Sequence, residues 1–234
     1  MVLNKRILRE LRANFSRYFS LLILVAFGMF ACIAMSASAD SVMRTVSDFW
    51  DESHIEDGEF SVLVPLTDSE LSALRDKGIT IERQFSMDIT LKDSSKLRIY
   101  RTREQINNPH IDTGTAPVDA SEIMLESSYA AAHGYAVGDT VGLSGKTLTI
   151  TALGVAPDYD FLLENFTDTA ANAEHFGIAF VTDAGYKALQ AASADSSEEY
   201  LYTYTLPEGM THSELKKLTD DFDFDHEDVE NVYV

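Results

Sequence analysis

The longest apolar run of the chain lies near its N-terminus. Between Arg17 and Asp40 stand 22 consecutive uncharged residues, YFSLLILVAFGMFACIAMSASA. As a helix that rises about 1.5 Å per residue, this run spans roughly 33 Å, which matches a hydrocarbon core of about 30 Å. The pattern predicts a transmembrane helix over residues 18–39.

Residues 1–17 carry apolar and basic side chains at helical spacing. One face holds Leu3, Ile7, Leu8, Leu11 and Phe15, and the remaining positions include Lys5, Arg6, Arg9 and Arg12. The spacing indicates a cytoplasmic amphipathic leader in the membrane interface. A basic flank that only sets the topology explains the same residues, and both interpretations stay open.

A strand–helix–strand–strand pattern fills residues 60–105. The predicted strands are Phe60–Leu66, Ile79–Leu91 and Lys96–Arg101, the last two joined by a turn at Asp93–Ser95. Thr67 and Glu70 have the spacing of a capping box at the start of the helix, and Gly78 ends it. Residues 41–59 before this unit predict a helical extension of the membrane segment.

A second copy of the pattern lies at residues 198–234. It has a strand at Glu199–Leu206, a capping box at Thr211 and Glu214, and a strand at Val229–Val234. Both helices contain Ser-Glu-Leu-x-x-Leu, at Ser69–Leu74 and Ser213–Leu218. Two β-α-β halves predict a ferredoxin-like α+β sandwich.

An inserted β-rich subdomain is expected at residues 120–185. Its elements are a strand at Glu122–Glu126, a helix at Ser127–His133 closed by Gly134, and a hairpin of Tyr135–Leu143 with Lys146–Val155. We therefore expect the α+β class: one transmembrane helix, then a domain over residues 40–234 made of β-α-β units with this insertion.

Charge divides the chain at the end of the apolar run. The whole sequence has 18 Lys and Arg against 38 Asp and Glu, a net charge of −20, yet the part before Asp40 is basic. The basic flank predicts a cytoplasmic N-terminus and a single-pass chain whose acidic domain faces outward. The acidity argues against nucleic acid as a partner, and the single Cys excludes an intramolecular disulfide.

A cleaved signal peptide is the main competitor for the membrane segment. Ala37–Ala39 has the small-x-small pattern of a cleavage site, but the apolar run is longer than the usual h-region of about 7–15 residues. Cys32 is predicted to be a packed thiol in the membrane segment rather than a lipid attachment site.

Motifs with known chemistry fail on spacing. Gly142–Thr147 is similar to a P-loop, but its first Gly is missing and it lies in a hairpin. Asp221–Asp225 is similar to a calcium loop, but His226 and Val232 replace required residues. The strand Tyr200–Tyr204 is expected to carry half-exposed aromatic side chains with a structural role. The alternative is that these tyrosines form a stacking platform for a sugar or a peptide. We expect no catalytic, cofactor-binding or metal-binding residue among the histidines His54, His110, His133, His175, His212 and His226 or elsewhere.

Several segments resemble the FtsX-like/MacB-like permease family of ABC transporters. They are Glu122–Glu126, Gly134, Val137–Val141 and Ala152–Tyr159, together with an N-terminus of the form Lys5-Arg6-x-Leu8-Arg9-Glu10-Leu11. The resemblance implies a permease subunit that is not an enzyme, whose outer domain contacts a substrate or a partner protein. It further implies a separate cytoplasmic ATPase, a second permease copy and the lipid bilayer as partners.

Three interpretations of the whole chain stay open. Val234 is reached without a second apolar run, so we expect an N-terminal fragment or one piece of a split permease. A membrane-anchored binding or sensor domain that needs no further helices is the alternative. A hydrolase secreted after cleavage at Ala39 is the third. The transported substrate stays unknown.

Overall fold

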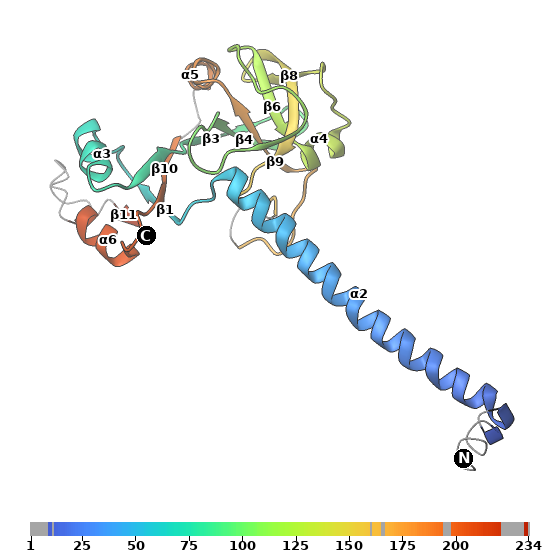
Figure 1. Ribbon diagram of the computed structural model, residues 1–234. Helices are drawn as coiled ribbons and strands as arrows, with labels where there is room; N and C mark the ends of the chain where they lie inside the picture. Colours follow the sequence, from blue (N-terminus) through green and yellow to red (C-terminus); the bar gives the residue numbers. More distant parts are fainter. Residues whose placement is uncertain are drawn as a thin grey trace. The chain divides into compact units, whose positions relative to one another are not determined.

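The computed structural model describes residues 9–10, 12–159, 161–164, 167–193, 198–220 and 232–233 (Figure 1). The chain divides into two units, Met1–Trp50 and Asp51–Val234. Most of the predicted leader and the acidic segment Asp221–Asp225 lie outside the described residues.

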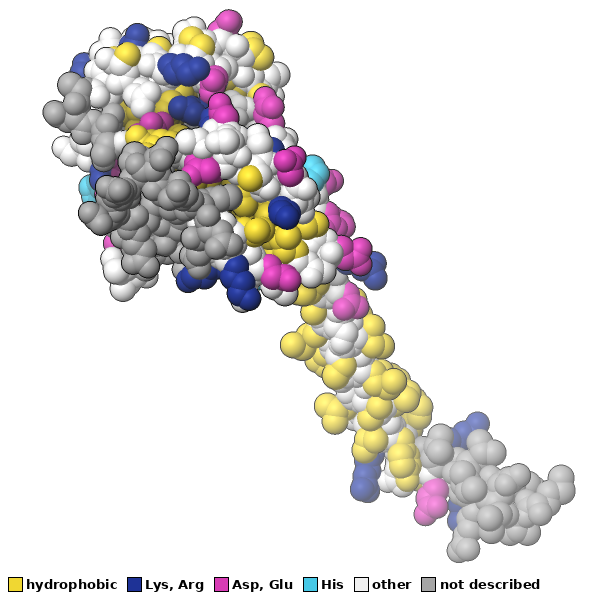
Figure 2. Space-filling view, turned by 90° about the vertical axis from the view of Figure 1, so that its left-hand side faces the viewer, with side chains coloured by type: hydrophobic (Ala, Val, Ile, Leu, Met, Phe, Trp, Pro, Cys, Tyr) yellow, Lys and Arg dark blue, Asp and Glu magenta, His cyan; other side chains and the backbone are white. Residues whose placement is uncertain are grey.

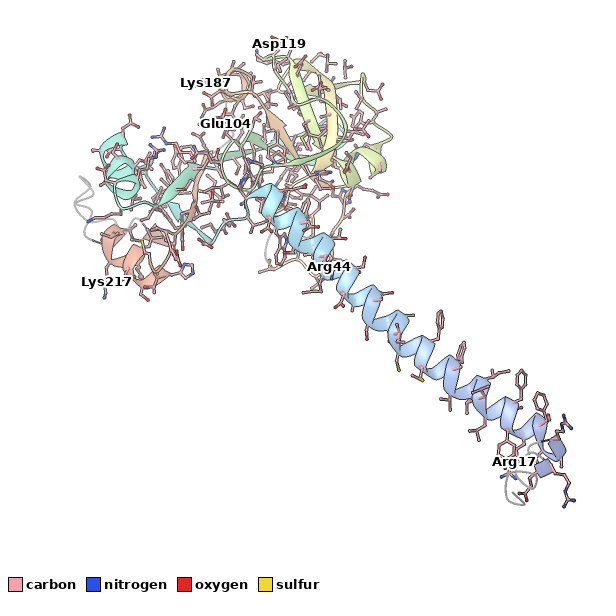
Figure 3. All side chains as sticks on the ribbon, viewed as in Figure 1. Arg17, Arg44, Glu104, Asp119, Lys187 and Lys217 are labelled. Atoms are coloured by element: carbon pink, nitrogen blue, oxygen red, sulfur yellow. The ribbon has the colours of Figure 1, made fainter. Side chains whose placement is uncertain are left out.

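Helix α2, Phe15–Ser53, makes up most of the first unit and includes the whole predicted span. Large apolar side chains at consecutive positions, such as Leu21 to Val25, are more than half exposed, so they point to every side of the helix. Figure 2 shows hydrophobic side chains gathered along it, and Figure 3 labels Arg17 and Arg44 on either side of the apolar run. By length and composition, α2 can cross a membrane.

The helical extension is shorter than the sequence predicts. Helix α2 ends at Ser53, and His54 has a φ of 50°. A residue in the left-handed region cannot continue a right-handed helix, so the chain turns there and enters β1 at Gly58.

One half of the second unit has the ferredoxin-like arrangement. Its elements in chain order are β1 (Gly58–Val62), α3 (Asp68–Arg75), β2 (Thr80–Arg83), β10 (Glu198–Thr205), α6 (His212–Asp220) and β11 (Val232–Tyr233). The strands lie in the order β11, β1, β10, β2, and every neighbouring pair is antiparallel. This β-α-β-β-α-β path confirms the fold that the two sequence copies predict.

Both predicted helix starts are present in this half. The Thr67 side chain accepts the N–H of Glu70 and the Glu70 side chain accepts the N–H of Thr67, which completes a capping box. At α6 the Glu214 carboxylate accepts the Thr211 N–H at 2.8 Å. The helices bury Leu71, Leu74 and Leu215 against one face of the sheet.

The rest of the second unit is a mixed sheet with two helices. Its strands are β3 (Ser86–Thr90), β4 (Lys96–Arg101), β9 (Phe176–Val181), β6 (Glu122–Glu126), β8 (Lys146–Val155) and β5 (His110–Gly114), in that order across the sheet, and β7 (Thr140–Leu143) also pairs with β8. Helices α4 (Ser127–His133) and α5 (Asp183–Ala192) pack on one face, where Tyr129 and Tyr186 are buried. The opposite face forms a second core around Tyr100, Phe176 and Phe180.

The sequence predicts one continuous strand over Ile79–Leu91, and this prediction is wrong. It forms β2 and β3, which keep one register against β10, because Arg83 pairs with Tyr202 and Ser86 with Glu199. Between them the alternation of buried and exposed side chains is lost, since residues 84–87 are all buried. Strand β10 therefore pairs within both parts of the unit.

Candidate functional site

A hollow of about 320 Å³ lies in the second unit, where the two parts of the sheet meet. We call it the junction pocket. Its walls come from Glu56, Glu59, Arg98, Tyr100, Asp158, Tyr159, Phe161, Leu163, Glu164, Glu199 and Leu201. The alternation of β1 and β10 places Glu59, Glu199 and Leu201 on the sheet face opposite to the core of α3 and α6.

Arg98 on β4 organises one wall of the pocket. Its Nε donates to Asp88 Oδ1 at 2.8 Å and its Nη2 to Asp88 Oδ2 at 3.1 Å, a two-point pair across the β3–β4 hairpin. The same guanidinium donates to the Tyr159 hydroxyl at 3.5 Å and to the Glu164 carbonyl at 3.3 Å. Arg98 therefore holds the segment after β8 against β4.

Two tyrosine hydroxyls meet beside Arg98. The Tyr100 and Tyr159 hydroxyls are 2.8 Å apart, and Tyr100 is only 4% exposed. Burial, and then the neighbouring Tyr159, raise the pKa of Tyr100 well above its usual value. Tyr100 thus remains a neutral hydroxyl at physiological pH.

The buried Arg103 contacts two residues of the pocket wall, Asp158 and Tyr100. Arg103 donates to Asp158 through Nη1 at 2.6 Å and Nη2 at 2.9 Å, and its guanidinium lies 4.7 Å from the Tyr100 ring centroid. Burial alone would lower the pKa of Arg103, yet the attraction and hydrogen bonds of Asp158 raise it overall. Arg103 therefore stays charged, and Asp158 is fixed in the pocket wall.

The 102–109 loop between β4 and β5 joins this pocket to the end of α2. The N–H of Asn107 donates to the His54 carbonyl at 3.0 Å, and the N–H of Asn108 to the Ser53 carbonyl at 2.9 Å. The Asn107 side chain donates to Glu56 Oε2 at 2.7 Å and accepts the N–H of Glu56 at 3.0 Å. Residues 53–56 are thus held at four points.

Glu82 on β2 anchors the same loop from the other side. Its carboxylate accepts the backbone N–H groups of Glu104 at 2.9 Å, Gln105 at 3.2 Å and Ile106 at 2.8 Å. Glu104 is labelled in Figure 3. Since Glu82 lies within the ferredoxin-like half, the loop fixes residues 53–56 to that half as well as to β4.

The carboxylates of the pocket fall into two groups. Asp158 is paired with Arg103 and Glu164 with Lys96, whereas Glu56, Glu59 and Glu199 have no Lys or Arg within ion-pair distance in the described part of the chain. Burial raises the pKa of Glu56 from 4.5 to about 7; the Asn107 hydrogen bond opposes the rise, and Glu59 and Asp158 add to it. The partial desolvation of Glu59 beside the pocket, with the nearby charges of Asp158 and Glu199, likewise raises the pKa of Glu59.

The lining of this pocket suits the binding of a ligand. Carboxylates beside the rings of Tyr159 and Phe161 suit a positively charged group. None of the described lining residues is Ser, Thr, Cys or His, and its carboxylates and tyrosines are the groups that could take part in chemistry. Among the described residues no group of three or more His, Cys, Asp or Glu has a geometry that could hold a metal ion.

The sequence did not point to this pocket as a site. Its residues come from four separate stretches of the chain, and only Asp158, Tyr159 and Leu201 fall in segments singled out from the sequence. The sequence predicts half-exposed tyrosines in the strand Tyr200–Tyr204, and this is wrong for two of them. Tyr202 and Tyr204 are buried in the core, with 0% and 2% exposure. Gly142–Thr147 spans the β7–β8 hairpin turn, as predicted.

Comparisons with known proteins give structural neighbours only. No protein-family model and no curated protein matches the sequence. The periplasmic region of MacB from Actinobacillus actinomycetemcomitans is similar with a TM-score of 0.42 and 9% identity, over 71% of this chain and 83% of that one.

Two further structures are similar. One is a domain, from Porphyromonas gingivalis, of a protein described as a permease, with a TM-score of 0.41 and 13% identity over 77% of this chain and 84% of that one. The other is the extracellular domain of the noncanonic ABC-type transporter YknZ from Gram-positive bacteria, with a TM-score of 0.35 and 10% identity over 69% and 88%. The three structures are domains of MacB, of a permease and of an ABC-type transporter, which is the class of protein that the sequence resembles. All three TM-scores are below 0.5, so the likeness by itself carries no functional argument.

Proposed function

We propose that this chain is part of a permease subunit of an ABC transporter, anchored by α2 with its acidic α+β domain outside the cell. The observation that carries the proposal is one continuous helix, apolar on every side over residues 18–39, that precedes in the chain a domain with a ferredoxin-like half. The basic residues before α2 and the acidic domain after it support a cytoplasmic N-terminus.

In this proposal a separate cytoplasmic ATPase moves the outer domain through α2. Within the second unit, four hydrogen bonds hold residues 53–56, which directly follow the membrane unit in the chain, to the 102–109 loop, and this contact supports the proposal. The junction pocket is the surface that we assign to contact with substrate or partner protein, and its free carboxylates favour a cationic one.

Orientation can be tested by labelling single cysteines. Asp119→Cys lies in an exposed loop of the domain and Arg9→Cys lies before α2; both are made in a Cys32→Ser background. A membrane-impermeant maleimide should label Asp119→Cys in intact cells and Arg9→Cys only after permeabilisation. The reverse pattern would contradict the proposed orientation.

The partner can be tested by purifying the tagged full chain in mild detergent from its native membrane. We expect an ABC ATPase and vanadate-sensitive ATP hydrolysis to co-purify with it. Arg9→Glu with Arg12→Glu should weaken this association, while Asp119→Asn in the outer domain serves as the control. A chain that purifies without any ATPase would favour the anchored binding domain, for which the junction pocket is the supporting observation.

A further inference from the structure

An uncharged stripe with a seven-residue repeat runs along α2 and continues past the end of the apolar run. Alternate steps of three and four residues pass through Tyr18, Leu21, Val25, Gly28, Cys32, Met35, Ala39, Val42, Val46 and Phe49. We call these positions the seam. An apolar repeat sustained over more than about three to four heptads is typical of a helix that pairs with another helix in a left-handed coiled coil.

The part of the seam beyond Asp40 is exposed where lipid does not reach it. Headgroups add about 5–8 Å on each side of the hydrocarbon core, which is about four to five residues of helix. Val46 lies past this limit and is still more than a third exposed, and Trp50, which flanks the seam, lies about 15 Å past Asp40 and is 50% exposed. Val42 is 61% exposed. This stripe therefore needs a protein surface to cover it.

Charged residues of the same part of α2 avoid the seam. At 100° per residue, Arg44, Asp48 and Asp51 lie on the side of the helix opposite to Val42 and Val46. A partner helix can thus approach the seam without meeting these charges.

A second copy of the chain fits this surface. Two copies that insert in the same direction have parallel α2 helices with Asp40 at the same depth, so each seam residue faces its counterpart. An apolar seam then meets an identical apolar seam, which is the self-complementary contact of a two-fold dimer. Inside the membrane, Gly28 and Cys32 line a hollow on the helix surface between Val25 and Met29, and small seam residues let two backbones approach closely.

We propose that α2 pairs with α2 of a second copy of this chain, as a parallel coiled coil that begins in the membrane and continues to Phe49 beyond it. The inference rests on the membrane anchoring in the proposed function, and it gives that function a defined partner surface. It needs no ATPase, and it holds whichever side of the membrane the domain faces, because both copies insert alike.

Cysteine cross-linking of the full chain in its native membrane tests the pairing. Single cysteines are placed in a Cys32→Ser background, either on the seam as Val42→Cys and Val46→Cys or beside it as the matched controls Ser41→Cys and Ser47→Cys. With copper phenanthroline and oxygen as the oxidant, the seam cysteines should give about fivefold more reducible dimer than the controls, because seam residues of paired helices face each other. Co-expressed copies with two different tags should both be present in the dimer band.

Charges placed on the seam give an independent reading. In the chain with its native Cys32, Val42→Glu with Val46→Glu should strongly reduce cross-linking through Cys32, while Ser41→Glu with Ser47→Glu should leave it unchanged. The proposal is overturned if no seam cysteine cross-links, if seam and control cysteines cross-link equally, or if the seam cross-links only to a different protein. A cross-linked dimer that purifies without an ATPase would contradict the transporter assignment alone, and an anchored chain without seam cross-links would contradict the dimer alone.

Discussion

The Arg103–Asp158 pair is the most deeply buried ion pair of the junction pocket. The Arg103 side chain is 2% exposed and that of Asp158 15%. We expect Asp158→Asn to destabilise the domain by about 3–5 kcal/mol, because it leaves a buried guanidinium without its counter-charge. Urea denaturation followed by circular dichroism measures the loss. The double variant Arg103→Met, Asp158→Asn should recover much of it; equal losses in both variants would show that packing, not charge, is lost.

The sequence alone could not show which residues form the junction pocket, and the reason is physical. Glu56, Arg98, Asp158 and Glu199 are ordinary charged residues in the sequence, and their chemistry changes only when the sheet brings them together. By contrast, the cap at Thr67 was predictable, because a capping box satisfies helix N–H groups within four residues of chain. Local hydrogen bonds can be predicted from the sequence, whereas burial and long-range charge need the fold.

At the scale of elements, the pairing of β5 with β8 depends on Gly154. A Cβ on Gly154 would lie 2.0 Å from the carbonyl oxygen of His110 on β5. We expect Gly154→Ala to separate these strands and to cost about 1–3 kcal/mol in the free energy of unfolding. Gly142→Ala on β7, with no atom closer than 4.0 Å, is the matched control and should be much milder in the same denaturation experiment. Similar losses in both would contradict this reading of the strand contact.

Elements were predictable where their pattern is local. The α4 helix with Gly134 and the β7–β8 turn at Ser144 and Gly145 occur where the sequence predicts them, although β7 begins at Thr140 and not at the predicted Tyr135. The break between β2 and β3 was missed, because burial from two directions at Gln84 and Phe85 does not alter the alternation of residue types enough to show. Strand β9 was also missed, since it is buried on both faces and has no period of two.

For the whole molecule, β10 explains how two sheets form one second unit. Its first residues pair with β3, and the rest lies between β1 and β2. The ferredoxin-like half was predictable from two similar sequence segments because each is a complete β-α-β unit. The junction pocket arises where these two sheets share a strand, so it belongs to neither sequence pattern alone.

If α2 spans a membrane, charged residues inside its apolar run should prevent its insertion. Leu24→Asp with Phe27→Asp places two charges inside the apolar run, each at a cost of about 2.5–3.5 kcal/mol for insertion at the helix centre. We expect this variant to be extracted from membranes by alkaline carbonate, while the wild type stays in the pellet. Thr45→Asp with Ser47→Asp adds the same charges to α2 beyond the apolar run and should stay in the pellet as well. A wild-type chain found in the supernatant with Asp40 as its first residue would instead mean that the segment is a cleaved signal and that the domain is secreted.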